Sequence, residues 1–228
     1  MSFSAAKPTS TQVELAGAVF TLLPQHAVWW PEKKSVFVAD THFGKEATFR
    51  SASIPVPDQT LQQLQRLNDV LNLTQASRLI ILGDLLHSRR GRCELTFERI
   101  SMWRQLQANL DVVVVRGNHD RHAGSPPADW HFRCVEPPFP DGGLSLFHEP
   151  PSETDNALQP RSGLAGHLHP AIRLKGPARD SVRLPCFLLR RGVLILPAFS
   201  PFVDHKIQQL EQGDRVFAIA EDAVIQVS

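Results

Sequence analysis

Five polar clusters along this chain combine carboxylate, amide and imidazole groups, which are ligands that proteins use to hold divalent transition metals. The clusters are Asp40-Thr-His42, Gly83-Asp84-Leu-Leu-His87, Gly117-Asn118-His119-Asp120, His148 and Gly166-His167-Leu-His169. Each one lies at or just beyond the end of a short apolar run that reads as a buried strand. We therefore expect the clusters to meet at one edge of a sheet and to form the metal site of an enzyme.

The number of ligands favours two metal ions over one. The candidate ligands are Asp40, His42, Asp84, Asn118, His148, His167 and His169. A tetrahedral zinc site needs only four ligands, whereas this set, with Asp84 as a bridge, suits two cations about 3.5–4 Å apart, as in hydrolytic two-metal sites. His119 is then free to protonate a leaving oxygen as general acid. Asp120 is expected to hydrogen-bond the His119 ring and to fix its tautomer.

Several nearby residues have more than one possible role. A single motif of this kind is often a buried Asp that caps a turn or a core His with its hydrogen bonds satisfied, so the prediction rests on the five clusters together. Three interpretations of His87 are open: it supports a metal ligand, it faces the substrate, or it caps a helix. The cations around the clusters form either a solvated surface or a rim that binds phosphate; they are Lys45, Arg89, Arg90, Arg92, Arg116 and Arg121. From these sets we assign His87, Arg89, Arg90 and Arg121 to substrate binding.

The pattern of apolar residues changes along the chain. Leucines at intervals of three and four residues predict a helix over 61–71, with Asp58 as its N-cap, and a similar pattern predicts a helix over 95–110. After about residue 126, short strand candidates follow one another, at 133–135, 144–147, 171–174, 182–189, 193–196, 216–219 and 223–227. This order predicts an α/β fold in which two packed mixed β-sheets, the second mostly antiparallel, are flanked by α-helices (an αββα sandwich).

The composition is typical of one soluble domain. The chain has 228 residues, of which 42% are hydrophobic, and its net charge of +1 gives no global basic field. Locally, residues 161–191 hold seven Lys or Arg against one acid, Asp180. Three cysteines without a C-x-x-C pair, a polar N-terminus and no apolar run near ~20 residues predict a cytoplasmic protein with no membrane contact. We expect a flexible N-terminus over 1–12 and a single domain over 13–228.

The clusters, taken in order, resemble the five signature blocks of the calcineurin-like metallophosphoesterase superfamily. A narrower similarity is to the bacterial DNA ligase-associated metallophosphoesterases, of the PdeM type. It rests on the stretches Val38–Lys45, Leu82–Ser88, Val115–Arg121, Ala165–Pro170, Leu184–Phe187 and Leu196–Phe199. This similarity extends from about Trp29 to Phe217, and no ligand of the superfamily pattern is missing.

The resemblance implies a two-sheet sandwich flanked by helices and a specific division of the ligands. The first metal would take Asp40, His42, Asp84 and His169, and the second Asp84, Asn118, His148 and His167. His119 would be the catalytic acid. Manganese is the metal that the superfamily suggests, with iron, zinc or magnesium as alternatives. The narrower family implies an endonuclease acting on DNA in repair, in association with a DNA ligase and a helicase.

Two other functions stay open from the sequence. One is a phosphatase or phosphodiesterase for a small nucleotide or a lipid-linked sugar, which the net charge near zero favours. The other is a non-catalytic interaction module on the same fold, against which the complete ligand set argues.

Overall fold

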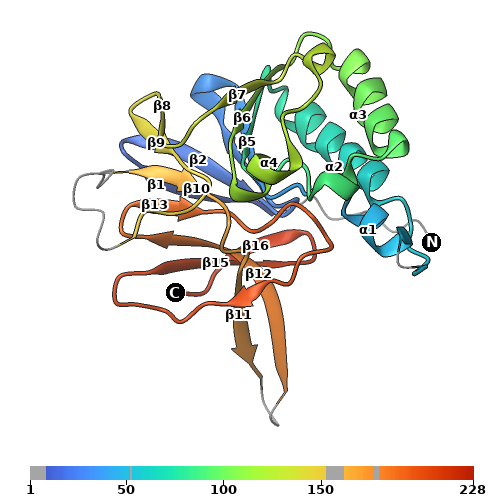
Figure 1. Cartoon of the computed structure of the whole chain (residues 1–228). Helices are drawn as coiled ribbons and strands as arrows, with labels where there is room; N and C mark the ends of the chain where they lie inside the picture. Colours follow the sequence, from blue (N-terminus) through green and yellow to red (C-terminus); the bar gives the residue numbers. More distant parts are fainter. Residues whose placement is uncertain (1–8, 52, 153–161, 177–179) are drawn as a thin grey trace, which may run out of the picture.

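The computed structural model describes residues 9–51, 53–152, 162–176 and 180–228, which form two β-sheets and a layer of helices (Figure 1). The first sheet has the strand order β1-β2-β3-β4-β5-β6-β7. Its strands are β1 (Thr11–Leu15), β2 (Ala18–Leu23), β3 (Ala27–Trp30), β4 (Ser35–Ala39), β5 (Arg78–Leu82), β6 (Asp111–Val115) and β7 (Arg133–Val135).

The second sheet has the order β14-β11-β12-β13-β10-β9-β8, and β15 and β16 join it through β12. Its strands are β8 (Phe139–Asp141), β9 (Leu144–Leu146), β10 (Gly163–Ala165), β11 (Pro170–Lys175), β12 (Ser181–Arg190), β13 (Val193–Ile195), β14 (Lys206–Ile207), β15 (Arg215–Ala220) and β16 (Ala223–Gln226). The expected pair of packed mixed sheets is thereby confirmed.

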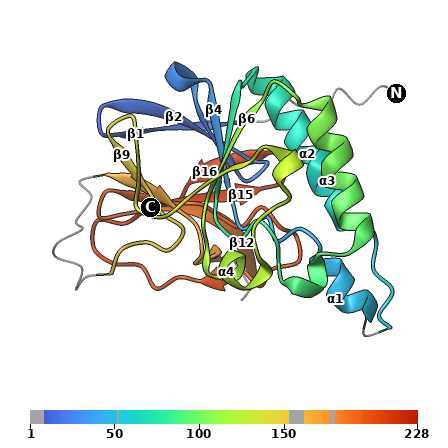
Figure 2. The same cartoon turned by 45° about the horizontal axis from the view of Figure 1, so that its top comes forward.

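The helices lie on the side of the first sheet (Figure 2). They are α1 (Lys45–Ser51), α2 (Gln59–Thr74), α3 (Glu94–Leu106) and α4 (Asn118–Ala123), with 3-10 turns at Pro31–Lys33, Arg89–Gly91 and Ala128–Trp130. The predicted helices correspond to α2 and α3, and the Asp58 carboxylate caps α2 by accepting a hydrogen bond from Leu61 N at 3.1 Å. Strand periodicity divides the core: Val36 and Val38 of β4 pack toward these helices, whereas Phe37 packs toward the second sheet.

Two groups of parallel strands bring the polar clusters together. In the first sheet β4 pairs parallel with β5, and β5 with β6. In the second sheet β10 pairs parallel with β9 and with β13. Parallel neighbours end at the same edge of a sheet, so the segments that follow β4, β5 and β6 emerge together, as do those that follow β9 and β10.

The structure differs from the sequence prediction in three respects. β7 joins the first sheet, parallel to β6, although it belongs to the strand-rich second half. The second sheet contains parallel pairs as well as antiparallel ones, because β9, β10 and β13 are joined by connections that return the chain to the same side. Ordered structure also begins inside the segment 1–12, because Thr9 pairs with Ala223 and β1 starts at Thr11.

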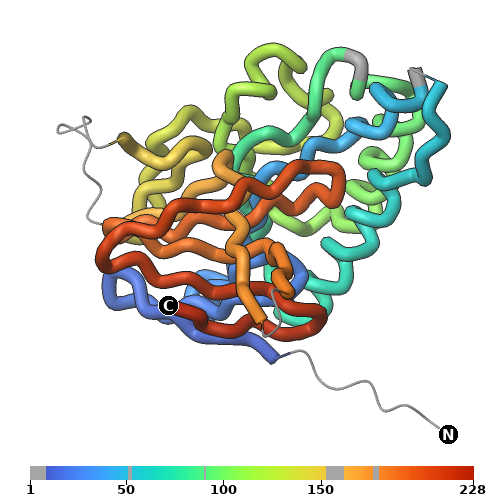
Figure 3. Tube along the Cα trace, turned by 90° about the horizontal axis from the view of Figure 1, so that it is seen from below, coloured from blue at the N-terminus to red at the C-terminus, as the bar shows by residue number. Residues whose placement is uncertain are grey.

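The N-terminal strands lie against the C-terminal ones. The Thr11 hydroxyl donates a hydrogen bond to the Val224 carbonyl at 2.6 Å, and Figure 3 shows the N-terminal strand (blue) beside the C-terminal strands (red). Residues 1–8 lie outside the described residues. Among the described helices, none is long and apolar enough to cross a membrane.

A histidine of the β2–β3 turn is held in its neutral form. The Ala198 carbonyl can only accept a hydrogen bond, so His26 Nδ1, 2.8 Å away, carries the proton. Desolvation is the main reason that the pKa of His26 is lowered to about 3, and the Arg66 guanidinium and His205 contribute to this shift. Between pH values of about 3 and 6.5, the unfolded chain therefore binds a proton at His26 that the folded chain does not bind.

We predict that this histidine contributes to acid destabilisation. Its stabilising contribution is complete above the unfolded pKa of about 6.5 and is lost as the pH falls toward about 3, with a slope of up to about 1.4 kcal/mol per pH unit. Urea unfolding across this range should show a shallower pH dependence for His26→Asn. The matched control is His131→Asn, since His131 is exposed and also has a positive φ of 52°. An unchanged slope in His26→Asn would contradict the assignment.

Candidate metal centre

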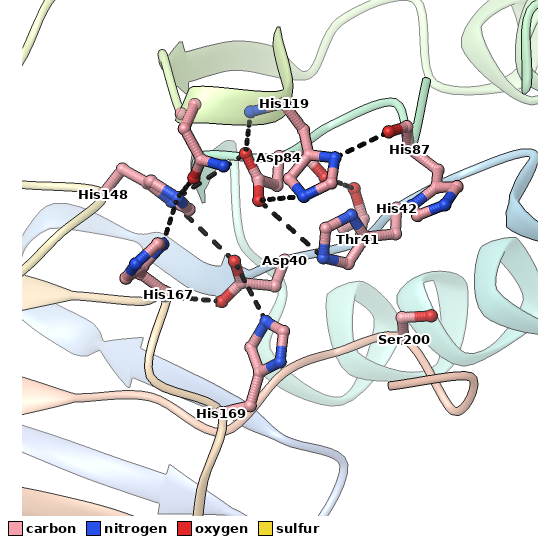
Figure 4. A network of polar contacts seen from close by, with 12 residues as sticks. Asp40, Thr41, His42, Asp84, His87, His119, His148, His167, His169 and Ser200 are labelled. Atoms are coloured by element: carbon pink, nitrogen blue, oxygen red, sulfur yellow. Dashed lines mark hydrogen bonds and ion pairs between the residues drawn. The ribbon is translucent and has the colours of Figure 1, made fainter. Parts of the chain in front are cut away.

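The seven predicted ligands meet in one place, at the carboxyl ends of strands from both sheets (Figure 4). Asp40 and His42 follow β4, Asp84 follows β5, and Asn118 follows β6. His148 follows β9, and His167 and His169 follow β10. The expectation of a site at one edge of a single sheet is therefore corrected, because the site lies where the edges of two sheets adjoin.

One group of donor atoms surrounds Asp40. His169 Nε2 lies 3.5 Å from Asp40 Oδ1, and the donor atoms of Asp40, His42 and His169 all lie within 4.8 Å of one another. His42 Nε2 also lies 3.8 Å from Asp84 Oδ2. Burial is the main reason that the pKa of His42 is lowered to about 2, with contributions from the neighbouring His119 and His169, so its ring is neutral and offers a lone pair.

A second group surrounds His148. The Leu82 carbonyl fixes the proton on His148 Nδ1 at 3.1 Å, which leaves a lone pair on Nε2. That nitrogen lies 2.8 Å from Asn118 Oδ1, 3.0 Å from His167 Nδ1 and 3.5 Å from Asp84 Oδ1. The amide oxygen and the imidazole nitrogen are both acceptors, so the pair calls for a cation or an additional proton between them.

These donor sets fit divalent cations for an electrostatic reason as well. Asp40 Oδ1 is buried and has no hydrogen-bond partner among the described residues. Burial is the main reason that the pKa of Asp84 is raised to about 6, and the nearby Asp40 charge contributes to this rise. Two carboxylates in one buried space disfavour each other's ionised forms. A cation coordinated by both removes this penalty and satisfies the unpartnered oxygen.

The backbone at the ligands has an unusual conformation. Five of the seven predicted ligands have positive φ values, between 44° and 68°: Asp40, His42, Asp84, His167 and His169. Residues other than glycine rarely adopt this left-handed region, and each instance costs on the order of 1 kcal/mol or more. Such strain concentrates at functional sites, where the surrounding structure fixes it. The loops are therefore shaped to aim side chains into the site, at a cost in stability.

Glycines beside the ligands leave room for the ligands themselves. A Cβ on Gly117 would overlap the Asp84 carboxylate, and one on Gly83 would overlap the His148 ring. A Cβ on Gly166 would lie 2.7 Å from Asp40 Oδ2. Each motif glycine therefore lies where a ligand from another strand end passes, which explains why three of the five clusters begin with glycine.

Asp120 has a different role from the one predicted. Its carboxylate accepts hydrogen bonds from the backbone N–H groups of Gly117 at 2.8 Å, Asp84 at 2.9 Å and Leu85 at 2.9 Å. The expected hydrogen bond to the His119 ring is replaced by one from His119 Nδ1 to the His87 carbonyl, at 2.7 Å. Asp120 thus positions the loop that carries Asp84, because the peptide groups of that loop are closer to it than the imidazole is.

His119 and His87 lie beside the ligands. His119 Nε2 is 4.0 Å from Asp84 Oδ2, and its side chain is 39% exposed. The His87 ring stacks on His119 with centroids 5.3 Å apart, and His42, His87 and His119 form a further group whose donor atoms lie within 4.8 Å of one another. Burial is the main reason that the pKa of His87 is lowered to about 4, and Lys45 and His119 contribute to this shift. His87 therefore belongs to the imidazole cluster and does not cap a helix.

The arginines near the site mostly bind groups of the protein itself. Arg89 donates to the His122 carbonyl at 3.2 Å, and Arg92 donates to the Ala123 carbonyl at 3.2 Å. Arg116 and Arg121 lie 3.3 and 3.9 Å from the two carboxylate oxygens of Glu136. The side chain of Arg90 lies outside the described residues. The predicted phosphate rim is thus occupied in large part by internal contacts.

The sequence did not identify the backbone support that comes from beyond β13. Phe199 N donates to the Ala39 carbonyl at 2.7 Å, and Ser200 N donates to the Asp40 carbonyl at 3.1 Å. These bonds hold the end of β4 from the far half of the chain. The Leu196–Phe199 stretch resembles a family motif, and the hydrogen bond from Phe199 N gives it a physical role.

Comparison with known proteins now gives the family. The family model for calcineurin-like phosphoesterases matches residues 33–171, more than half of the chain. This chain belongs to the calcineurin-like phosphoesterase family. The family and the convergent His and Asp side chains indicate a metal-dependent hydrolase that acts on phosphoester bonds.

The fold of this chain matches that of a solved nuclease structure. The crystal structure of the Pseudomonas putida nuclease MPE matches with a TM-score of 0.80 and 33% identity, over 96% of this chain and 100% of that chain. A phosphoesterase from E. coli, Yfce, is 16% identical with a TM-score of 0.40, over 85% of this chain and 97% of that chain. A search of the curated proteins found no match.

We predict that Gly117→Ala weakens metal binding by roughly 10–100-fold, the usual effect of displacing the support of a ligand. The added methyl group would push the Asp84 carboxylate aside. Titration calorimetry with Mn²⁺ measures the affinity. The matched control is Gly176→Ala, because a Cβ there meets nothing closer than 3.7 Å. Equal affinities in both variants would contradict the steric argument.

Proposed function

We propose that this calcineurin-like phosphoesterase is a two-metal phosphodiesterase that cleaves DNA. The observation that carries the two-metal part is the position of Asp84. Its Oδ2 faces His42, 3.8 Å away, and its Oδ1 faces His148, 3.5 Å away. One carboxylate oxygen thus serves each donor group, which is what a bridging ligand requires.

We propose that the seven ligands are divided between two cations along the same lines as the two donor groups. Asp40, His42, Asp84 and His169 would hold one cation, and Asp84, Asn118, His148 and His167 the other. Mn²⁺ is our first candidate, and iron, zinc or magnesium ions suit the same oxygen and nitrogen donors. When bound, the two cations supply positive charge at the phosphoryl oxygens and an acidified water.

The residues of the chain supply the remaining steps. His119 donates its Nδ1 proton to the His87 carbonyl, so only Nε2 is directed toward Asp84 and the donor groups. A protonated His119 would carry a second proton on that nitrogen and would deliver it to the leaving oxygen. Its backbone N–H donates to Asp84 Oδ1 at 2.9 Å, which links the acid to the bridging carboxylate. His87, stacked on His119, is the candidate to contact the substrate, together with Arg89, Arg90 and Arg121.

The DNA substrate is supported by the likeness to a nuclease. The matching Pseudomonas putida protein is described as a nuclease, and the match covers that chain completely. The narrower resemblance to DNA ligase-associated metallophosphoesterases supports a role in DNA repair, in association with a DNA ligase and a helicase. The partly exposed His119 suits a large substrate, because part of the ring is reachable from solvent.

A second candidate function is hydrolysis of a small phosphoester, such as a nucleotide or a lipid-linked sugar. The net charge of +1 favours it. The arginines near the site favour it as well, because Arg89, Arg92 and Arg116 already have partners within the protein and so offer fewer N–H donors to a polymer.

We predict that His119→Ala lowers kcat for an oligonucleotide by roughly 10²–10⁴-fold with Mn²⁺ present, because a general acid contributes about that much. The loss should be smaller for the chromogenic diester bis-p-nitrophenyl phosphate, because its nitrophenolate leaving group needs little protonation. Mn²⁺ affinity should change little, since His119 is outside both proposed donor groups. His122→Ala is the control, as His122 is exposed on the same helix. Wild-type kcat for the oligonucleotide in His119→Ala would remove His119 from the mechanism.

We also predict that the purified protein nicks plasmid DNA and labelled oligonucleotides, with rates that fall steeply as salt is added. Phosphate contacts release counterions, so each one contributes a slope of about −0.9 to the logarithm of affinity against the logarithm of salt. Gel assays with Mn²⁺ over a salt series measure this slope. Hydrolysis of the chromogenic diester without any DNA cleavage at low salt would favour the small-substrate function.

A further inference from the structure

The β11–β12 hairpin extends away from the rest of the molecule, as Figure 1 shows. It starts at Pro170, directly after the predicted ligand His169. Only its base is covered at the outer edge, because β14 pairs with β11 at Pro170 and Ala171 alone. Farther out, residues Arg173–Lys175 have a strand neighbour on one side only, β12.

The two faces of this hairpin differ in chemistry. Arg173 lies directly opposite Arg183, and Lys175 lies opposite Ser181. Residues directly opposite each other, and residues two apart on one strand, share a face. Arg173, Lys175 and Arg183 therefore form one basic face. The other face is apolar, with Ile172 paired to Leu184 and Leu174 to Val182.

The charge on this basic face is largely uncompensated. All three cations are exposed. Arg183 lies 3.1 Å from Asp204, in a pair that solvent screens because the side chains are 52% and 80% exposed. Within the described part of the chain, no acid lies within ion-pair distance of Arg173 or Lys175. Like charges directly opposite on two strands are destabilising, so Arg173 and Arg183 together call for an external anion.

The distance from the metal ligands identifies the kind of anion. A strand rises about 3.3 Å per residue, which puts Arg173 and Lys175 roughly 13 and 20 Å along the strand from His169. The Debye length at physiological salt is about 8 Å. These cations are therefore screened from a small phosphoester at the metals, whereas a polymer that continues past the cleaved bond can contact them directly.

We propose that the basic face of the β11–β12 hairpin, defined by Arg173, Lys175 and Arg183, binds the phosphate backbone of a nucleic acid outside the cleaved bond. This inference rests on the proposed nuclease function and assigns part of its affinity to a surface away from the centre. The hairpin then selects polymers over small phosphoesters, because only polymers reach both the metals and the face.

The test uses the double variant Arg173→Ala/Lys175→Ala in the full chain. Its kcat/KM for a labelled oligonucleotide should fall roughly tenfold at low salt, and the salt slope of binding should flatten by about 2, since two phosphate contacts are removed. Its kcat/KM for bis-p-nitrophenyl phosphate should equal that of the wild type. Arg173→Lys, which keeps the charge, should retain most of the oligonucleotide activity.

The matched control is Lys33→Ala/Arg133→Ala, which removes the same charge. Both residues are exposed. They lie near the start of β4 and at the start of β7, and because these strands run parallel in the first sheet, both are at the end opposite the metal ligands. A uniform effect of net charge would lower oligonucleotide cleavage equally in both double variants and would overturn the proposal.

Other outcomes also decide the proposal. Equal losses on both substrates in Arg173→Ala/Lys175→Ala would mean that the hairpin supports the centre structurally. Unchanged cleavage with self-association in size-exclusion chromatography would mean that the charges only protect an open sheet edge. Both results would overturn the proposal.

If the wild type cleaves no DNA, the proposed nuclease function fails separately. Fluorescence anisotropy of oligonucleotide binding then still tests the role of the hairpin. Lower affinity in Arg173→Ala/Lys175→Ala than in the wild type supports binding by the basic face, and unchanged affinity overturns it.

Discussion

Two buried carboxylates facing each other are the constraint on which the rest of this structure depends. The donor atoms of Asp40, Asp84 and His148 lie within 4.8 Å of one another, and all three residues are buried. In a metal-free protein this arrangement is unfavourable, since burial and the Asp40 charge raise the pKa of Asp84 to about 6. The structure around them can be understood as the means of holding two negative charges in place for cations. The strained backbone, the glycines without room for a side chain and the bracing by Asp120 all serve that end.

The bracing comes from several parts of the chain, so no single loop carries the site. Asp120 ties the Asp84 loop to the start of α4 through three backbone N–H groups. His42 N and Phe43 N donate to the Asp84 and Leu85 carbonyls, which joins the loops after β4 and β5. Ser200 N reaches the Asp40 carbonyl from the segment that follows β13. A site assembled across two sheets thus gains its rigidity from backbone hydrogen bonds, which do not depend on the side chains left free as ligands.

The sequence predicted which polar side chains come together, because they follow short apolar strands, a local signal. Helices α2 and α3 were predicted for a similar reason, the three-to-four-residue spacing of their apolar side chains. Contacts between distant segments were less accessible. Nothing local shows that β7 pairs with β6, or that the site involves two sheets. The role of Asp120 was misjudged because adjacency to His119 in sequence suggested contact, whereas the first turn of α4 directs its carboxylate to the backbone of Asp84. His87 stayed ambiguous for the same reason, since its place beside His119 is a tertiary contact.

The metal ligands alone do not identify the substrate. The ligand set is suited to phosphoester chemistry in general, and the nearby arginines are mostly engaged with carbonyl groups and Glu136. Discrimination between a polymer and a small ester must then come from contacts that only one of them can make. With a net charge of only +1, the chain cannot attract a polyanion through its overall field. Affinity for a polymer therefore has to come from cations that are local, exposed and without internal partners, and with respect to the described residues Arg173 and Lys175 meet these conditions.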